Sequence, residues 1–176
     1  MTTIPLVSKW LERILGHEGG FSLVSADPGN WTGGTVGHGT LKGTKWGIAA
    51  NTYPDLDIRH LTKEQAADIY IRDYLSKVQA PLLEDGVAFQ LLDFAINSGP
   101  KRAIKALQWA VHAEPDGDLG PVTLAAVAKY SESDLVMLLI AARLDFMADL
   151  PTWPSFGRGW AHRLADNLRY AAEDTE

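Results

Sequence analysis

The chain has 176 residues, a length that suits one domain with a sizeable hydrophobic core. It contains no cysteine, which excludes disulfides, thiolate nucleophiles and cysteine-ligated zinc or iron–sulfur centres. The formal net charge is -6 and Lys and Arg form no run, so we expect no nucleic acid among the partners. The sequence shows no signal peptide and no stretch of about 20 apolar residues, and we expect a protein made in the cytoplasm.

The first predicted element is a helix over residues 5–17, where apolar residues recur at helical spacing. It ends at Glu18, where Gly19 and Gly20 supply a left-handed cap. Residues 20–47 have no helical period and are rich in glycine and threonine. We predict a long loop there, with a short β-hairpin over residues 32–45. A loop of this length inside a compact domain is usually functional.

Helices are expected to dominate the rest of the chain. Thr62 and Gln65 have the spacing of a capping box, which opens a helix that continues to Tyr74. Further helices are expected at about 83–98, 101–111, 121–130, 133–149 and 156–172. The predicted fold is therefore mainly α, with a long glycine-rich active-site loop or a short β-hairpin.

Glu18 is a candidate catalytic acid because of its position at the end of an apolar helix. The C-terminal end of a helix carries partial negative charge, which disfavours an ionised carboxylate. A carboxylic acid that stays protonated near neutral pH can protonate a glycosidic oxygen. The alternative interpretation is an ordinary surface glutamate at a helix end.

Asp27 follows Glu18 within the glycine-rich loop. If the loop folds back over the helix end, the two carboxylates face each other across a cleft, as in many glycosidases. An Asp before Pro-Gly is equally well explained as turn chemistry, in which the side chain accepts a hydrogen bond from its own backbone. The sequence alone leaves both interpretations open.

Several motifs together carry a family resemblance. They are His-Glu-Gly-Gly-Phe at residues 17–21, Asp-Pro-Gly-Asn-Trp-Thr at 27–32, Gly-Thr-Lys-Trp-Gly-Ile at 43–48, and the runs 61–74 and 93–99. This set resembles glycoside hydrolase family 108. Residues 106–123 and 156–163 resemble the predicted peptidoglycan-binding region that commonly follows in such proteins, so the resemblance covers nearly the whole chain.

The resemblance implies a lysozyme-like helical fold and an N-acetylmuramidase, which cleaves the β-1,4 bond between N-acetylmuramic acid and N-acetylglucosamine in peptidoglycan. It implies that Glu18 is catalytic, and the analogy with phage-type lysozymes adds Asp27 and a threonine to the active site. Thr32 has the closer spacing, but Thr44 lies in the Thr-x-aromatic-Gly-Ile motif and is the residue we prefer.

Three further residues are candidates for substrate binding. Trp46 and Tyr70 would stack on sugar rings, and Asn97 would bond an N-acetyl group. Aromatic residues at helical spacing are more often core residues, and an Asn near a helix end often bonds the backbone instead. The histidines lack metal-ligand spacing, so we expect neither a metal nor another cofactor.

We expect a muramidase catalytic region in residues 1–98 and a peptidoglycan-binding-like helical region in residues 99–176, packed into one globular unit. The expected partner is the peptidoglycan glycan strand, and the expected state is a monomer.

The resemblance and the missing signal peptide favour a phage endolysin that waits in the host cytoplasm until a holin or another route gives it access to the wall in the periplasm. A lytic transglycosylase, a non-catalytic wall-binding module and a wall-remodelling secretion factor remain open, as does retention or inversion of the anomeric configuration.

Overall fold

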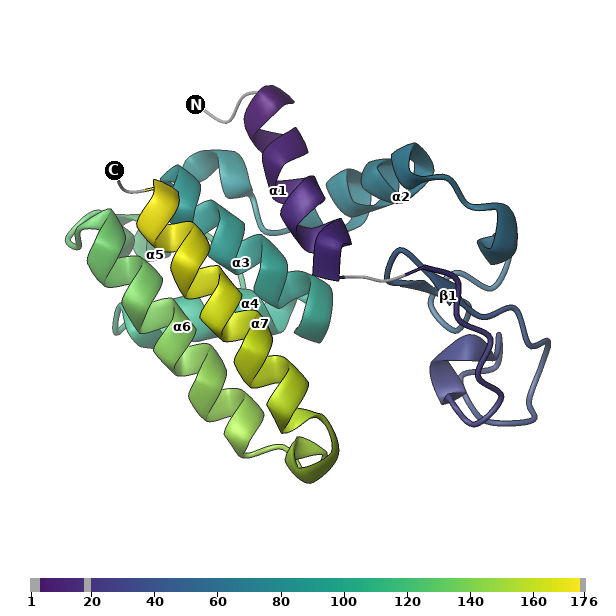
Figure 1. The fold of residues 1–176 in the computed structure, drawn as a ribbon. Coiled ribbons are helices and arrows are strands. Elements are labelled where there is room, and N and C mark those ends of the chain that lie inside the picture. Colours follow the sequence, from purple (N-terminus) through teal and green to yellow (C-terminus); the bar gives the residue numbers. More distant parts are fainter. Residues whose placement is uncertain (1–3, 18–19, 175–176) are drawn as a thin grey trace. The chain divides into compact units, whose positions relative to one another are not determined.

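The protein is described by a computed structural model that covers residues 4–17 and 20–174 (Figure 1). It divides into two compact units, one over Ile4–Ile71 and one that begins at Arg72. The predicted boundary between a catalytic and a binding region at residues 98–99, and the packing of both regions into one globular unit, stay predictions. No helix in the described part of the chain is long and apolar enough to cross a membrane.

The first unit opens with helix α1, Ile4–His17, which confirms the helix expected there. Its buried face carries Trp10, Leu11, Ile14 and Leu15. The remaining elements are η1 (Pro28–Asn30), β1 (Thr44–Lys45), β2 (Ile48–Ala49), η2 (Ile58–His60) and α2 (Lys63–Tyr70). The predicted capping box is confirmed at the start of α2, because Thr62 and Gln65 each accept a hydrogen bond from the other's backbone N–H.

The β-hairpin lies later in the chain than the glycine pattern predicts. Strands β1 and β2 are antiparallel, and Trp46 and Gly47 form the two-residue turn between them. Both turn residues have positive φ, 53° and 71°, as a type I′ hairpin turn requires. Tryptophan in the left-handed region is uncommon, so the turn has no recognisable sequence signal. The glycine-rich segment before it forms loops, with one isolated bridge between Trp31 and Leu41.

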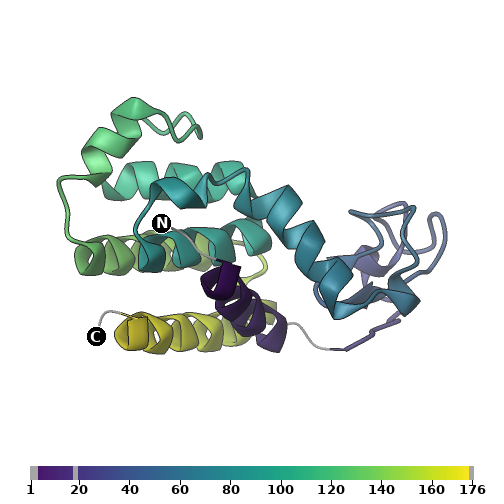
Figure 2. The same cartoon turned by 90° about the horizontal axis from the view of Figure 1, so that it is seen from above.

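The second unit is helical. A π-helical segment, Ile71–Leu75, continues from α2 across the boundary between the units. The helices that follow are η4 (Ala80–Leu82), α3 (Asp85–Ser98), α4 (Pro100–Ala110), α5 (Pro121–Val127), α6 (Glu132–Ala148) and α7 (Trp153–Asp174). Helix α3 is central: all its residues from Gly86 to Ala95 are buried, and it contacts α4, α6 and α7. Helices α6 and α7 lie side by side (Figures 1 and 2). The mainly α fold class is confirmed.

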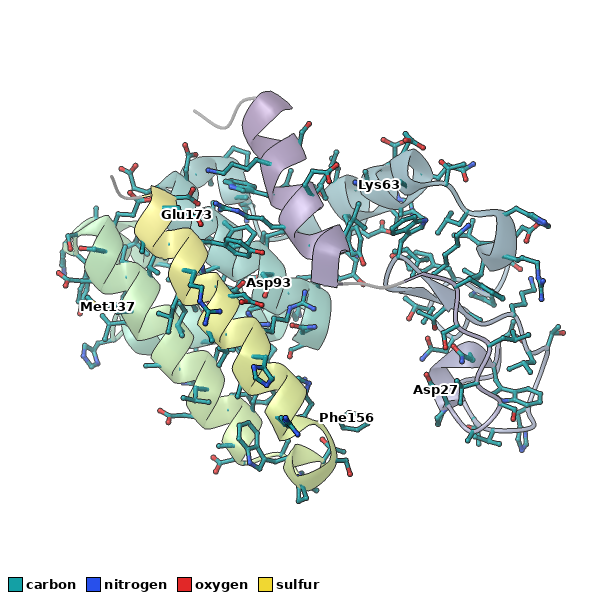
Figure 3. The ribbon with its side chains drawn as sticks, viewed as in Figure 1. Asp27, Lys63, Asp93, Met137, Phe156 and Glu173 are labelled. Carbon is teal, nitrogen blue, oxygen red and sulfur yellow. The ribbon has the colours of Figure 1, made fainter. Side chains whose placement is uncertain are left out.

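A buried ion network ties α3 to α6 and α7 (Figure 3). The carboxylate of Asp93 accepts hydrogen bonds from Arg143 Nη1 at 2.6 Å, Arg163 Nη2 at 2.7 Å and Asn167 Nδ2 at 2.8 Å. Burial alone would raise the pKa of Asp93, but the two guanidinium groups outweigh it and hold that pKa far below its ordinary value of 3.8. The network thus fixes the three helices against one another.

A second buried polar group explains the Asp-Gly-Asp turn before α5. Gln108 is fully buried on α4, and its Nε2 donates to Asp116 Oδ1 at 2.7 Å and to Thr123 Oγ1 at 3.0 Å. Its Oε1 accepts from Gly117 N at 2.9 Å. The turn is therefore held by one amide side chain.

Candidate active site

The predicted acid, Glu18, lies outside the described residues. Helix α1 ends at His17, directly before it, and the described residues resume at Gly20. The helix that was predicted to end at Glu18 is therefore present up to His17, and the catalytic role of Glu18 stays a prediction.

The loop after Glu18 is tied to β1 by two backbone hydrogen bonds. Ser22 N donates to Thr44 O at 2.8 Å, and Thr44 N donates to Ser22 O at 2.9 Å. The preceding Gly43 has φ 87°, and a Cβ there would clash with Ser22 O and lie 2.8 Å from the Phe21 ring. Glycine at this position therefore permits the close approach, which gives a physical reason for the Gly-Thr pair in the motif.

Asn30 links Thr44 to the segment that carries Asp27. Its side chain is fully buried, accepts from Thr44 Oγ1 at 2.7 Å and donates to Val24 O at 3.0 Å. Its backbone N–H donates to Asp27 O at 3.1 Å. Asn30 was not predicted as a site residue, because its position in the Asp-Pro-Gly-Asn motif indicates a turn but gives no sign of burial. We name Asp27, Asn30 and Thr44 the loop cluster.

Asp27 makes the turn contact expected of it and stays exposed. Its Oδ1 accepts from Gly29 N at 2.9 Å and so caps η1. Its Oδ2 accepts no hydrogen bond from any residue that the structure describes. The turn bond orients the carboxylate and leaves one oxygen for another partner, so the two interpretations of Asp27 are compatible.

The two candidate threonines have different surroundings. Thr32 Oγ1 accepts from Thr40 N at 2.9 Å and supports the backbone of the glycine-rich loop. Thr44 belongs to the loop cluster through Asn30. Of the two, Thr44 is the one that Asn30 links to the segment of Asp27, and its catalytic role stays a prediction.

Trp46 and Tyr70 are brought together, but not as two stacking surfaces. The Tyr70 hydroxyl donates to Trp46 O at 2.8 Å, and only 1% of Tyr70 is exposed. A ring buried to this degree has no face for a sugar, so its contribution is to hold the Trp46 turn. Trp46 is half-buried, and its Nε1 has no hydrogen-bond partner within the described ranges.

Asn97 belongs to the second unit, whereas the other described candidates belong to the first. It is exposed at the end of α3 and accepts a hydrogen bond from Arg143, which also pairs with Asp93. Within the described residues, no group of three His, Asp or Glu side chains is placed to hold a metal ion.

A mainly helical chain whose glycine-rich loops hold an exposed carboxylate, linked through the buried Asn30 to the half-buried Thr44, falls in the lysozyme-like class. Residues 11–99 match the family model of glycosyl hydrolase 108, and the chain belongs to this family. The match includes the positions of Glu18, Asp27 and Thr44. Family membership makes the protein a glycosidase of the peptidoglycan-hydrolase type.

Among solved structures, SagA of Brucella abortus is similar over 97% of this chain and 96% of its own, with 34% sequence identity and a TM-score of 0.83. No curated protein matches the chain. The family match ends at residue 99, so a peptidoglycan-binding role for the C-terminal helices stays a prediction.

Proposed function

We propose that the protein is an N-acetylmuramidase that hydrolyses the β-1,4 bond between N-acetylmuramic acid and N-acetylglucosamine. The observation that supports this most is the loop cluster, which connects Asp27 to Thr44 inside the family match. The cluster lies in the same unit as α1, the helix that ends directly before Glu18.

In this proposal Glu18 donates its proton to the leaving glycosidic oxygen. Bond cleavage then places positive charge on the sugar, in an oxocarbenium-like transition state. The exposed carboxylate of Asp27 stabilises that charge or directs water. Its turn bond to Gly29 keeps it oriented before the substrate arrives, so little reorganisation is needed during the reaction.

Thr44 assists through its lone pairs. Its O–H proton is already donated to Asn30, so the hydroxyl oxygen remains as an acceptor. An acceptor at this position can take a hydrogen bond from the attacking water. That bond orients the water so that the lone pair of the water oxygen points toward the sugar. Asn30 thereby positions Thr44 without contacting the substrate.

Product analysis tests this proposal against a lytic transglycosylase. We expect wild-type digests of purified peptidoglycan to end in reducing N-acetylmuramic acid, and we expect Asp27→Asn to lose most activity. A transglycosylase instead yields an anhydro sugar that is lighter by one water, and it would retain activity in Asp27→Asn. Mass spectrometry of the released fragments separates the two outcomes.

For the biological setting we propose that the protein is a phage endolysin. The alternative is a bacterial wall-remodelling factor, and the similarity to a protein of the bacterium Brucella abortus supports this alternative. Expression of the chain with and without a holin in a Gram-negative host distinguishes the two. An endolysin lyses the cells only when the holin is present. A remodelling factor reaches the wall without it.

A further inference from the structure

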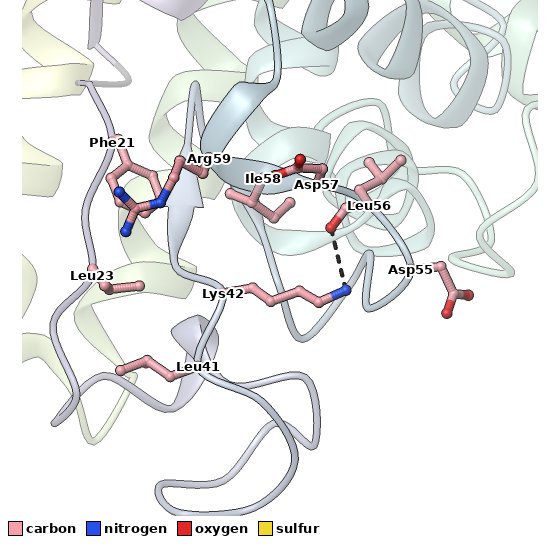
Figure 4. Close-up of a pocket in the computed structure, with 9 residues that line it drawn as sticks. All are labelled: Phe21, Leu23, Leu41, Lys42, Asp55, Leu56, Asp57, Ile58 and Arg59. Carbon is pink, nitrogen blue, oxygen red and sulfur yellow. Dashed lines mark hydrogen bonds between the residues drawn. The ribbon is translucent and has the colours of Figure 1, made fainter.

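The first unit contains a surface hollow that the proposed chemistry does not use (Figure 4). Its volume is about 290 Å³, near the lower end of the roughly 300–1,000 Å³ typical of ligand sites. Its lining includes Phe21, Leu23, Leu41, Lys42, Ile58 and Arg59. A hollow of this size suits a small part of a larger ligand.

The hollow lies on the opposite side of the Ser22–Thr44 pair from the loop cluster. Side chains alternate between the two faces of an extended segment, so Phe21 and Leu23 point away from the face of Ser22. A Cβ on Gly43 would meet both Phe21 and Leu23, which places them on the face opposite Thr44. The hollow is therefore separate from Asp27 and Thr44, although the Ser22–Thr44 pair lies between them.

Arg59 presents its guanidinium to this hollow. It is exposed and lies over the Phe21 ring, 4.9 Å from its centroid. No acidic side chain in the described part of the chain pairs with it. An edge of a guanidinium offers two parallel N–H groups, which match the geometry of a carboxylate.

Lys42 adds a second cation and shapes the floor. Its Nζ donates to Pro54 O at 2.5 Å and Leu56 O at 3.5 Å, both neutral acceptors, so its charge is not neutralised by these bonds (Figure 4). Between the two cations lie apolar side chains, of which Ile58 is 1% exposed and Leu23 is 40% exposed. The hollow thus combines cationic groups with an apolar floor.

Two carboxylates limit what the hollow can bind. Asp57 pairs with His60 at 2.8 Å, and Asp55 points away from the other lining side chains (Figure 4). The lining is therefore neutral in total, which disfavours a polyanion. A ligand that has a carboxylate, small apolar groups and an amine fits this set of charges better than a neutral sugar does.

We propose that this hollow binds the peptide stem of peptidoglycan, with Arg59 pairing a stem carboxylate. Peptide stems are short, combine small aliphatic side chains with free carboxylates, and in the diamino-acid type carry an amine. The proposal rests on the proposed function, because the stem is attached to the glycan that the enzyme would cut. It makes Arg59 a residue that distinguishes stem-bearing from stem-free glycan.

Titration of the free tetrapeptide L-Ala–D-isoglutamate–diaminopimelate–D-Ala tests the site without any hydrolysis. We expect saturable binding to wild type, a loss of about ten- to a hundredfold in affinity for Arg59→Gln, and partial retention in Arg59→Lys. Arg158→Gln, an exposed arginine on α7, serves as the matched control and should bind as wild type. Absence of saturable binding to wild type, or equal binding by Arg59→Gln, overturns the proposal.

Hydrolysis supplies the second test. Arg59→Gln should reduce kcat/KM more on stem-bearing glycan than on the same glycan stripped by an amidase. Equal reduction on both substrates overturns the proposal. If wild type binds the peptide through Arg59 but cleaves neither glycan, the proposed function fails and the stem site stands. Thermal melts establish that each variant is folded.

Discussion

Replacement of Asp93 by Asn removes the only carboxylate shared by Arg143 and Arg163 among the described residues. Asp93 is 1% exposed in its side chain, and Arg143 is 2% exposed. The variant therefore leaves the desolvated guanidinium of Arg143 without its counter-charge and removes the Asp93 carboxylate from Arg163. A buried charge that loses its partner costs far more than a surface pair that is broken.

The expected loss follows from these contacts. Each hydrogen bond to a charged group contributes about 1.5–3 kcal/mol, and breaking a buried ion pair from one side costs about 3–5 kcal/mol. We expect Asp93→Asn to lower the free energy of unfolding by about 4 kcal/mol. Asp166→Asn, which removes an exposed pair with Arg169 on α7, should cost about 0–1 kcal/mol and serves as the matched control.

The same network predicts a pH dependence. Because the pKa of Asp93 is lowered in the folded state, its contribution is complete above the ordinary value of 3.8 and declines as the pH falls below it. One pH unit below that value, the stability difference between wild type and Asp93→Asn should have shrunk by about 1.4 kcal/mol.

Urea unfolding at several pH values, followed by circular dichroism, measures both quantities. A loss below about 1 kcal/mol for Asp93→Asn would contradict a stabilising role for the buried network, because it would equal the loss from an exposed pair. A stability difference that stays constant as the pH falls through 3.8 would refute the argument from the lowered pKa.

Three further predictions follow from the hydrogen bonds of individual side chains. Thr44→Val should lower kcat by about a hundredfold in a turbidity assay, because the water loses an acceptor, whereas Thr32→Val should leave kcat near the wild-type value; the reverse result would reassign the threonine. Tyr70→Phe should lower the free energy of unfolding by about 1 kcal/mol and reduce activity, because the Trp46 turn loses its support; unchanged urea curves and activity would contradict this. Gln108→Leu should cost about 3 kcal/mol in urea unfolding, since several buried groups lose their partner, and a loss near zero would exclude its bridging role.

Local patterns predicted the helices well because their causes are local. Apolar spacing located α1, and the capping pair Thr62 and Gln65 located the start of α2. The capping pair lies within one helical turn, and the apolar residues of α1 repeat at the helical period. Helix positions could therefore be predicted without knowledge of the tertiary structure.

Features that depend on strain or burial could not be predicted in the same way. The hairpin turn places Trp46 in a left-handed conformation, which a pattern of glycines does not indicate. Asn30 is buried by segments that follow it, so its position in a turn gave no sign of its link to Thr44. Tyr70 has the same helical spacing whether its ring stacks on a sugar or fills the core.

Contacts between residues that are distant in the sequence could not be predicted either. The Asp93–Arg143 and Asp93–Arg163 pairs join residues on three different helices. A single sequence contains the charges but does not say which of them pair. The family resemblance named Glu18, Asp27 and Thr44 together, and the structure adds the hydrogen bonds that connect the last two.

The most direct test of the proposed activity is the loss of turbidity of purified, outer-membrane-stripped peptidoglycan with wild type and Glu18→Gln side by side. We expect wild type to clear the suspension and the folded variant to be slower by at least about a thousandfold. Equal clearing by both would contradict the role of Glu18. Sedimentation of both proteins with the wall, without clearing by either, would replace the glycosidase with a wall-binding module.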